Sequence, residues 1–223
     1  MDRRLPFGWL AAVAVAISTV VGLFIVPADA AQGDAQRIMY VHVPSAWLAY
    51  AAFFVTLVGS LLYLVRRDLR FDRVAAASAE IGLVFTGLTI VTGAIWGKAT
   101  WGKWWDWDPR LTTTAILFVI YAGYLLLRQS IVERRRRARL AAVFGIIGFL
   151  NVPVVHFSVL WWRGLHQAPT IVRPGDPTID HLLLIELLAS VVAFTLVYVW
   201  LLRGRIDLER SHDDAELQLE PAP

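Results

Sequence analysis

Two histidines of this 223-residue chain stand among aromatic residues at the edges of long apolar runs. His42 lies in Tyr40-Val-His-Val-Pro-Ser-Ala-Trp47, and His166 lies in Trp161-Trp-Arg-Gly-Leu-His-Gln. Neutral imidazole is a common metal ligand, and two imidazoles from separate segments can approach one iron from opposite sides. A lone histidine at a membrane interface is more often an ordinary polar residue, so the surroundings decide whether this pair binds a metal.

The surroundings include a tryptophan-rich segment, Trp96-Gly-Lys-Ala-Thr-Trp101-Gly-Lys-Trp104-Trp105-Asp106-Trp107-Asp108-Pro-Arg110. Its two Trp-Gly steps and its proline predict a break in helical continuity and a compact loop. Indole faces offer large, rigid, polarizable area, which suits a flat apolar ligand. The cations Lys98, Lys103 and Arg110 can pair with carboxylates on such a ligand.

The two aspartates of this segment have another interpretation. Asp106 and Asp108 can hold the neighbouring cations, or they can cap the next helix. Because Asp108 stands directly before Pro109, at the first helical position, we favour capping over ligand contact for that residue.

Other polar residues are less informative. His156 lies inside an apolar run near Asn151 and Pro153, which favours structural hydrogen bonding over a second contact to the ligand. Glu80 and Glu186 lie near the ends of apolar runs, so each can be a hydrated carboxylate paired with arginine, and Glu186 can instead line the ligand pocket or contact a partner. His181, at a helix start, and His212, in the tail, carry no signal.

The composition indicates an all-α integral membrane protein. Hydrophobic residues make up 57% of the chain, and the mean hydropathy is +0.58. Uncharged runs of about twenty residues predict six transmembrane helices: Phe7–Val26, Ala46–Val65, Ala75–Trp96, Leu111–Leu127, Leu140–Val159 and Leu182–Leu202. We expect one membrane domain over residues 1–210 with a tryptophan-rich loop at 97–110, and a short disordered tail over 211–223.

The first apolar run has a competing interpretation. Arg3 and Arg4, the apolar run and then Ala28-Asp29-Ala30 resemble a cleavable signal peptide. The run is about twenty residues long, whereas the apolar part of a signal peptide has about 7–15 residues. We therefore favour a retained transmembrane helix.

Basic residues predict the orientation of the helices. With the N-terminus in the cytoplasm, 15 of the 21 lysines and arginines fall in cytoplasmic segments and 6 in the outer loops 27–45, 97–110 and 160–181. The outer six are Arg37, Lys98, Lys103, Arg110, Arg163 and Arg173. This bias follows the positive-inside rule and predicts that both termini are cytoplasmic. The net charge of +3 therefore reflects topology and not nucleic-acid binding.

Tryptophan follows the opposite distribution. Eight of the ten tryptophans lie in or beside the outer loops, and only Trp9 and Trp200 mark the inner face. An aromatic belt populates both interfaces, so the excess predicts a flat apolar ligand at the outer face. The chain has no cysteine, which excludes thiolate metal ligands and a thiol nucleophile, and we expect no enzymatic activity.

Together these segments resemble the WWD haem-handling family, and within it the short cytochrome c maturation protein C (CcmC, haem exporter protein C) type. The similarity covers nearly the whole chain and includes the His42 segment, the tryptophan-rich segment and the His166 segment. It implies that His42 and His166 are the axial ligands of a transiently bound haem b. It also implies that the segment 96–110 cradles the porphyrin, with Trp96, Trp101, Trp104, Trp105, Asp106, Trp107, Asp108 and Arg110 as contacts.

The same resemblance implies a function and partners. Haem would be bound at the periplasmic face of the bacterial inner membrane and delivered to a haem chaperone, CcmE, for c-type cytochrome biogenesis. An ABC-type complex of CcmA and CcmB and a small membrane subunit, CcmD, would be further partners. The alternatives are a haem permease subunit, which would need broken helices around a midplane site, and a membrane b-type electron-transfer protein, which would need paired histidines within facing helices.

Overall fold

A computed structural model describes residues 4–162, 164–167, 170–171 and 174–219, and side chains outside 5–211 are not described. Three arginines counted for the orientation, Arg3, Arg163 and Arg173, lie outside the described residues. The described residues form no strand and the following helices, in chain order: α1 Arg4–Val20, the π-helical turn η1 Val21–Ile25, the 3₁₀ helix η2 Asp34–Ile38, α2 Met39–Arg66, α3 Leu69–Trp101, α4 Pro109–Ser130, α5 Arg134–Phe149, α6 Asn151–Trp161 and α7 His181–Leu219.

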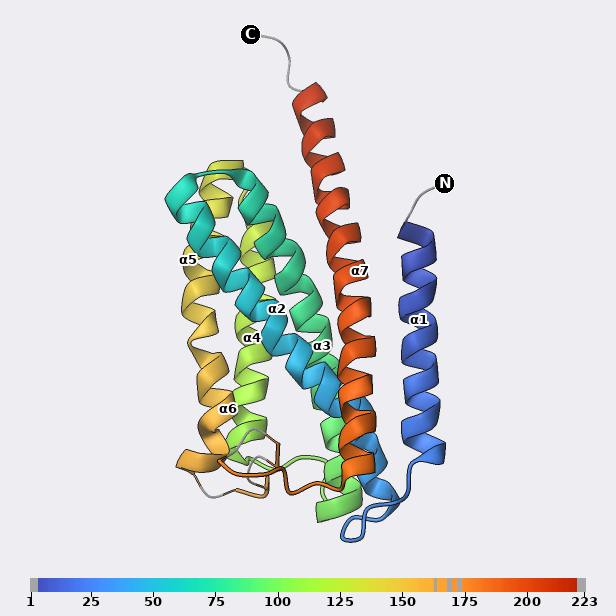
Figure 1. Cartoon of the computed structure of the whole chain (residues 1–223). Coiled ribbons are helices and arrows are strands. Elements are labelled where there is room, and N and C mark those ends of the chain that lie inside the picture. Colours follow the sequence, from blue (N-terminus) through green and yellow to red (C-terminus); the bar gives the residue numbers. More distant parts are fainter. Residues whose placement is uncertain (1–3, 163, 168–169, 172–173, 220–223) are drawn as a thin grey trace.

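Among the described residues, six helical segments are long and apolar enough to cross a membrane, which confirms the predicted number of transmembrane helices. They are Leu5–Ile25, Asp34–Arg66, Leu69–Trp101, Pro109–Ser130, Arg134–Trp161 and His181–Ser211. The start of α1 and the end of α7 lie at one end of the bundle, and the connections after α1, α3 and α6 lie at the other (Figure 1). We call these the terminal end and the loop end.

Helices α2 and α3 form the centre of the bundle. Helix α5 packs on α2, and α4 packs on α3, α5 and α6, whereas α7 covers the other side and carries α1 on its outer surface (Figure 1). Stacked aromatic rings fill the core, with the centroids of Phe53 and Tyr121 3.6 Å apart. Gly82 makes this packing possible, because a Cβ atom there would lie 2.6 Å from the Phe53 ring.

Ion pairs join the helices toward the terminal end. Arg128 of α4 donates from its two terminal nitrogens to the two carboxylate oxygens of Asp72 on α3, at 2.6 and 3.0 Å. Arg205 of α7 pairs with Glu80 of α3, which agrees with the arginine-paired interpretation of that carboxylate. Glu186 differs, because its carboxylate accepts hydrogen bonds from Ser18 of α1 and Ser190 of its own helix at 3.0 and 3.3 Å.

Four helical segments differ from the prediction. Helix α2 begins at Met39 and not near Ala46, so His42 lies on a helix and not in a loop. Helix α3 continues through Gly97 to Trp101, and only the stretch from Gly102 to Asp108 is non-helical. Gly97 does not break the helix because it serves packing: the Trp101 ring lies 3.2 Å from the position of its missing Cβ atom.

The other two differences concern the second half of the chain. The fifth span is divided into α5 and α6, because Pro153 has no N–H to donate to the carbonyl of Phe149, where α5 ends. Helix α7 continues to Leu219, beyond residue 211, where we expected a disordered tail to begin.

Candidate functional site

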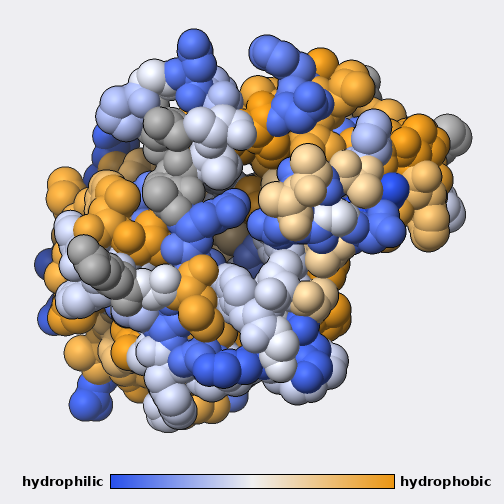
Figure 2. Space-filling view, turned by 90° about the horizontal axis from the view of Figure 1, so that it is seen from below, coloured by the Kyte–Doolittle hydropathy of each residue, from blue (hydrophilic) through white to orange (hydrophobic). Residues whose placement is uncertain are grey.

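The sequence-predicted site residues lie at the loop end of the bundle. Seen from that side, the surface is hollowed near its centre, and hydrophilic residues and residues of intermediate hydropathy surround the hollow (Figure 2). Several large aromatic side chains stay exposed at this end: Trp104 is 60% exposed and Trp107 79%. Exposed apolar area of this kind marks ligand or partner surfaces.

His42 is held between two helices. Its Nδ1 atom lies 3.1 Å from Oγ1 of Thr92 on α3. The hydroxyl hydrogen of Thr92 is donated to the carbonyl of Leu88, at 2.7 Å, so Oγ1 accepts and Nδ1 of His42 must carry the proton. The Nε2 lone pair is therefore available to a metal ion.

A glycine and a tryptophan complete the environment of His42. A Cβ atom on Gly93 would lie 2.9 Å from Cε1 of His42, so the imidazole occupies space that the glycine leaves open. The Trp96 ring meets the imidazole edge to face, with the centroids 5.6 Å apart. Trp96 itself is held by a hydrogen bond from its Nε1 to Oε1 of Gln32, at 2.9 Å.

His166 is held by a carboxylate. Its Nδ1 atom lies 2.9 Å from Oδ1 of Asp108, and because an ionised carboxylate only accepts, Nδ1 donates. Nε2 is again left available to a metal ion. The Trp101 ring meets this imidazole edge to face, with the centroids 4.9 Å apart.

Asp108 connects the two loops of the site. It caps α4, as predicted, by accepting from the backbone N–H groups of Arg110 and Leu111 at 2.8 and 3.4 Å. Its Oδ2 atom also accepts from the backbone N–H of Leu165, at 2.6 Å. A Cβ atom on Gly164 would lie 2.0 Å from this oxygen, so the carboxylate fits only because residue 164 has no side chain.

The electrostatics keep Asp108 charged and His166 neutral. Burial raises the pKa of Asp108, but His166 and the N–H donors of Leu165 and Arg110 outweigh it, so this pKa lies below its usual value. Burial lowers the pKa of His166, Arg110 acts in the same direction, and Asp108 opposes both without cancelling them. A neutral His166 at pH 7 is the form that can bind a metal ion.

The two histidines and one arginine converge. His42 and His166 lie within the range of electrostatic interaction with one another. Arg110 lies close enough to interact electrostatically with both histidines. Arg110 donates from Nη2 to the carbonyl of His156 at 2.9 Å, and its buried Nε has no partner among the described residues. The His156 ring contacts Tyr50 and Phe157, without a hydrogen bond among the described side chains.

The rest of the tryptophan segment lies beside these groups. Trp105 and Trp107 meet edge to face with centroids 5.8 Å apart. The cations are partly engaged, since Lys103 pairs with Asp106 at 2.7 Å and Lys98 donates to the carbonyl of Gly102 at 3.0 Å. The arrangement thus brings His42, His166, Trp96, Trp101, Asp108 and Arg110 together, and it leaves Trp104 and Trp107 on the surface.

The arrangement suits an iron whose remaining ligands come from a macrocycle. The described residues contain no group of three or more histidine, cysteine, aspartate or glutamate side chains that could hold a metal ion. Two imidazoles with free Nε2 atoms supply two axial bonds, which is what a porphyrin iron lacks.

Sequence analysis missed three residues of the site: Thr92, Gly93 and Gly164. Gly164 stands in the predicted Trp-Arg-Gly-Leu-His segment, two residues before the histidine, and a glycine there was a readable signal of a close backbone approach. Thr92 and Gly93 give no such signal, because they are far from His42 in the sequence.

The chain is similar to proteins of one family. The family described as heme exporter protein C (CcmC) matches residues 2–218. A heme exporter protein C of Bradyrhizobium diazoefficiens is 43% identical over 89% of this chain and 76% of its own length. The Haemophilus influenzae protein of the same name is 38% identical over 94% of this chain and 85% of its own length, and the Escherichia coli K12 protein is 39% identical over 76% and 71%.

Proposed function

The chain belongs to the haem exporter protein C family, and from this premise we propose that it binds haem between His42 and His166 and delivers it for c-type cytochrome biogenesis. The names of its relatives support a role in haem handling. The six apolar helices support a multi-pass protein of the bacterial inner membrane.

The observation that carries the proposal is that both imidazoles have the same tautomer, with the proton on Nδ1. Each has its Nδ1 atom committed, to Thr92 in one case and to Asp108 in the other, so each presents Nε2. Bound haem supplies an iron with two open axial positions. The protein supplies the two ligands, fixes their tautomers and keeps His166 neutral.

Aromatic rings and a cation complete the proposed haem site. Trp96 and Trp101 each contact one histidine ring and offer indole surface to the porphyrin. Arg110, whose Nε is unsatisfied among the described residues, offers a donor to a haem propionate. Trp104, Trp105 and Trp107, with Asp106, form the outer part of the site, where an acceptor can approach.

The openness of this surface supports transfer over permanent binding. A membrane cytochrome encloses its haem between helices, whereas Trp104 and Trp107 are 60% and 79% exposed. We therefore propose that haem b is bound transiently, that the chain is a carrier and not an enzyme, and that the acceptor is a periplasmic chaperone of the CcmE type. CcmA, CcmB and CcmD are the proposed partners within the membrane.

The proposal requires the loop end to face the periplasm. The distribution of basic residues, 15 against 6, supports this orientation with both termini in the cytoplasm. A reporter enzyme fused at Gly102 should show periplasmic activity, and one fused at Arg67 should show cytoplasmic activity. The reverse pattern would remove the proposed site from the compartment of its acceptor.

The ligand assignment is tested by absorption spectroscopy of the purified, haem-loaded protein. His42→Ala and His166→Ala should each change the bis-histidine spectrum and lower haem occupancy, and added imidazole should restore part of both by occupying the vacated axial position. His156→Ala is the matched control, because among the described residues that ring packs on Tyr50 and Phe157 and pairs with neither proposed ligand, and it should keep the spectrum. Equal loss in all three variants without imidazole rescue would indicate misfolding and contradict the assignment.

A further inference from the structure

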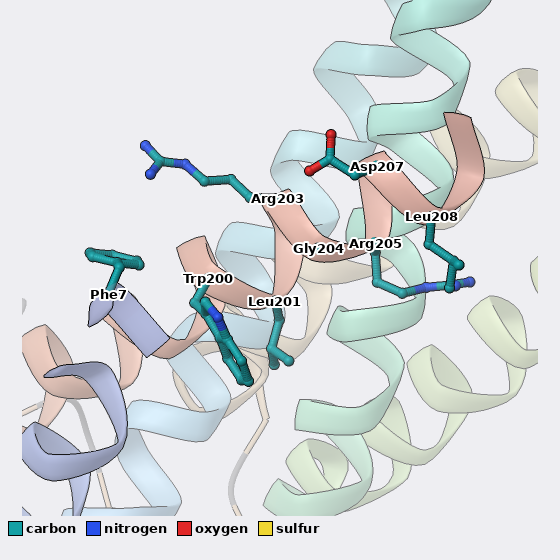
Figure 3. Close-up of a pocket in the computed structure, with 8 residues that line it drawn as sticks. All are labelled: Phe7, Trp200, Leu201, Arg203, Gly204, Arg205, Asp207 and Leu208. Carbon is teal, nitrogen blue, oxygen red and sulfur yellow. The ribbon is translucent and has the colours of Figure 1, made fainter. Parts of the chain in front are cut away.

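A cavity lies at the terminal end, opposite the proposed haem site. It has a volume of about 500 Å³ and lies between the start of α1 and the residues of α7 from Trp200 to Leu208. Figure 3 shows the lining side chains: Phe7 comes from α1, and Trp200, Leu201, Arg203 and their neighbours come from α7. Nothing in the proposed haem function uses this cavity.

The cavity lies at the boundary between the apolar and the charged parts of both helices. The first apolar segment begins at Leu5, two residues before Phe7. On α7, the apolar run ends at Leu202, and Arg203 is the first charged residue after it. Trp9 and Trp200 are partly exposed at the same level, as expected of aromatic residues at a membrane interface. The cavity therefore opens where phospholipid headgroups begin.

Two arginines line the cavity, Arg203 and Arg205, and they differ in their partners among the described residues. Arg205 is committed to carboxylates, pairing with Glu80 and, at 3.2 Å, with Glu209. Arg203 is exposed, and its guanidinium carbon lies 5.6 Å from the centre of the Phe7 ring. In Figure 3 the Arg203 guanidinium reaches toward the Phe7 side and away from Asp207, whereas Arg205 points to the opposite side of α7.

Two glycines shape the cavity in opposite ways. Gly8 brings α1 and α7 together, because a Cβ atom there would lie 2.6 Å from Nε1 of Trp200. Gly204, by contrast, faces open space, with no atom within 4 Å of its missing Cβ atom. Glycine inside a helix is less favourable than alanine, and no close contact with the described residues at Gly204 compensates for this. Its effect is to keep the cavity wide beside Arg203.

We propose that this cavity binds the phosphate headgroup of an anionic phospholipid from the same membrane leaflet. Arg203 would donate to the phosphodiester, and the glycerol and upper acyl chain would lie against Phe7, Trp200 and Leu201. Basic pockets between transmembrane helices on the cytoplasmic side are suited to such headgroups. The lipid would bridge the start of α1 and the segment of α7 that lines the cavity.

Lipid retention tests the proposal. The full-length protein, purified in mild detergent, is incubated with phosphatidylglycerol or with phosphatidylcholine, and bound lipid is counted by native mass spectrometry. Phosphatidylglycerol should be retained and should raise the melting temperature, and phosphatidylcholine should do neither. Arg203→Gln should retain at least about tenfold less phosphatidylglycerol, because one charge-assisted contact is lost. Gly204→Phe should also lose it, by filling the cavity.

Matched variants separate the cavity from general charge and folding effects. Arg203→Lys should keep most of the binding, and Gly204→Ala should keep it while slightly stabilising the helix. Arg66→Gln is the charge control, because Arg66 lies over the Phe71 ring at 5.9 Å in a similar cation–π contact on another helix, and it should retain lipid as the wild type does.

Three outcomes would overturn the proposal. They are equal retention by Arg203→Gln and the wild type, an equal loss in Arg66→Gln, and equal retention of the two lipids. A last experiment incubates the lipid-free protein with inorganic phosphate. If phosphate raises the melting temperature as much as phosphatidylglycerol does, the ligand is free phosphate and the lipid assignment is wrong.

Discussion

His42 and His166 present the same nitrogen to the proposed haem iron, but the protein holds them in different ways. His42 lies on α2, and its partner Thr92 lies on the adjacent helix α3, so two packed helices fix its position. His166 lies in the connection after α6, and its position depends on Asp108, which precedes α4. One ligand belongs to the rigid bundle, and the other is joined to it by a carboxylate.

The difference has chemical and mechanical consequences. A carboxylate partner makes an imidazole a more basic ligand than a hydroxyl partner does, so His166 should form the stronger axial bond. A loop residue can also move away when its hydrogen bonds break, whereas a helix residue cannot. The comparison therefore predicts that His166 controls both the affinity for haem and its release, and that His42 provides a fixed reference position.

The largest difference should come from the two glycines beside the histidines. In Gly164→Ala the new Cβ atom would lie 2.0 Å from Oδ2 of Asp108, so the carboxylate must leave both His166 and Leu165. We expect haem affinity to fall more than about 100-fold, beyond the usual loss for one outer-shell contact. In Gly93→Ala the nearest atom is Cε1 of His42, at 2.9 Å, and a small ring displacement relieves the contact.

Haem titration of the two purified alanine variants measures this contrast. Gly93→Ala should weaken binding clearly less than Gly164→Ala, and both should keep the helical circular dichroism of the parent. A greater loss in Gly93→Ala would reverse the comparison and assign the sensitive ligand to the helix pair.

Asp108→Asn should have the next largest effect. Asparagine caps a helix as well as aspartate does, so α4 should persist while His166 loses its charged partner. The expected loss is about 10–100-fold in haem affinity at pH 7, read from the Soret band during titration. Unchanged affinity would show that the carboxylate serves only as the α4 cap.

Asp108→Asn should weaken haem binding at pH 7 but extend the binding that remains to lower pH. Haem binding requires neutral His166, and burial holds the pKa of His166 below its ordinary value of about 6.5, so wild-type binding should be lost only below that pH. Asp108 raises the pKa of His166. Removing the charge should therefore shift the acid midpoint of binding to lower pH, even though affinity at pH 7 is weaker.

Thr92→Val should have the smallest effect of the series. Valine keeps the shape of threonine but removes the acceptor for Nδ1 of His42, and one neutral hydrogen bond contributes about 1 kcal/mol, or about fivefold. Because the helices still hold the ring, the spectrum should remain bis-histidine. Thr86→Val on the same helix is the control, since that buried hydroxyl donates to the backbone of Gly82 and should not affect haem binding. A loss as large as that of Asp108→Asn would show that the two imidazoles depend equally on their partners.

The sequence predicted the parts of this structure that depend on local chemistry. Apolar runs predicted six spans because their length is set by the bilayer, and Asp108-Pro109 predicted a capped helix start. The boundary near His42 was wrong because an apolar-run criterion stops at polar residues, whereas the helix continues through them to Met39. The division at Pro153 was visible only as a weak interruption.

The contacts that orient the histidines were not predictable from one sequence. Asp108 and His166 are 58 residues apart, and His42 and Thr92 are 50 residues apart, so their pairing depends on how the helices pack. The Trp-Gly step at Gly97 was misread for the same reason, since the glycine accommodates the ring of Trp101. Periodicity and turn signals carry no information about such encounters.

The pairing of α1 with α7 has a consequence for biosynthesis. Ser18 and its acceptor Glu186 are separated by 168 residues, and at a synthesis rate of about 5–20 residues per second the second follows the first by roughly 8–35 s. During that interval the first helix is in the bilayer without the neighbour against which it packs, and the Ser18 hydroxyl must bond to its own backbone. The first helix to be inserted is therefore the last to be assembled, and release of an incomplete chain leaves it unpaired.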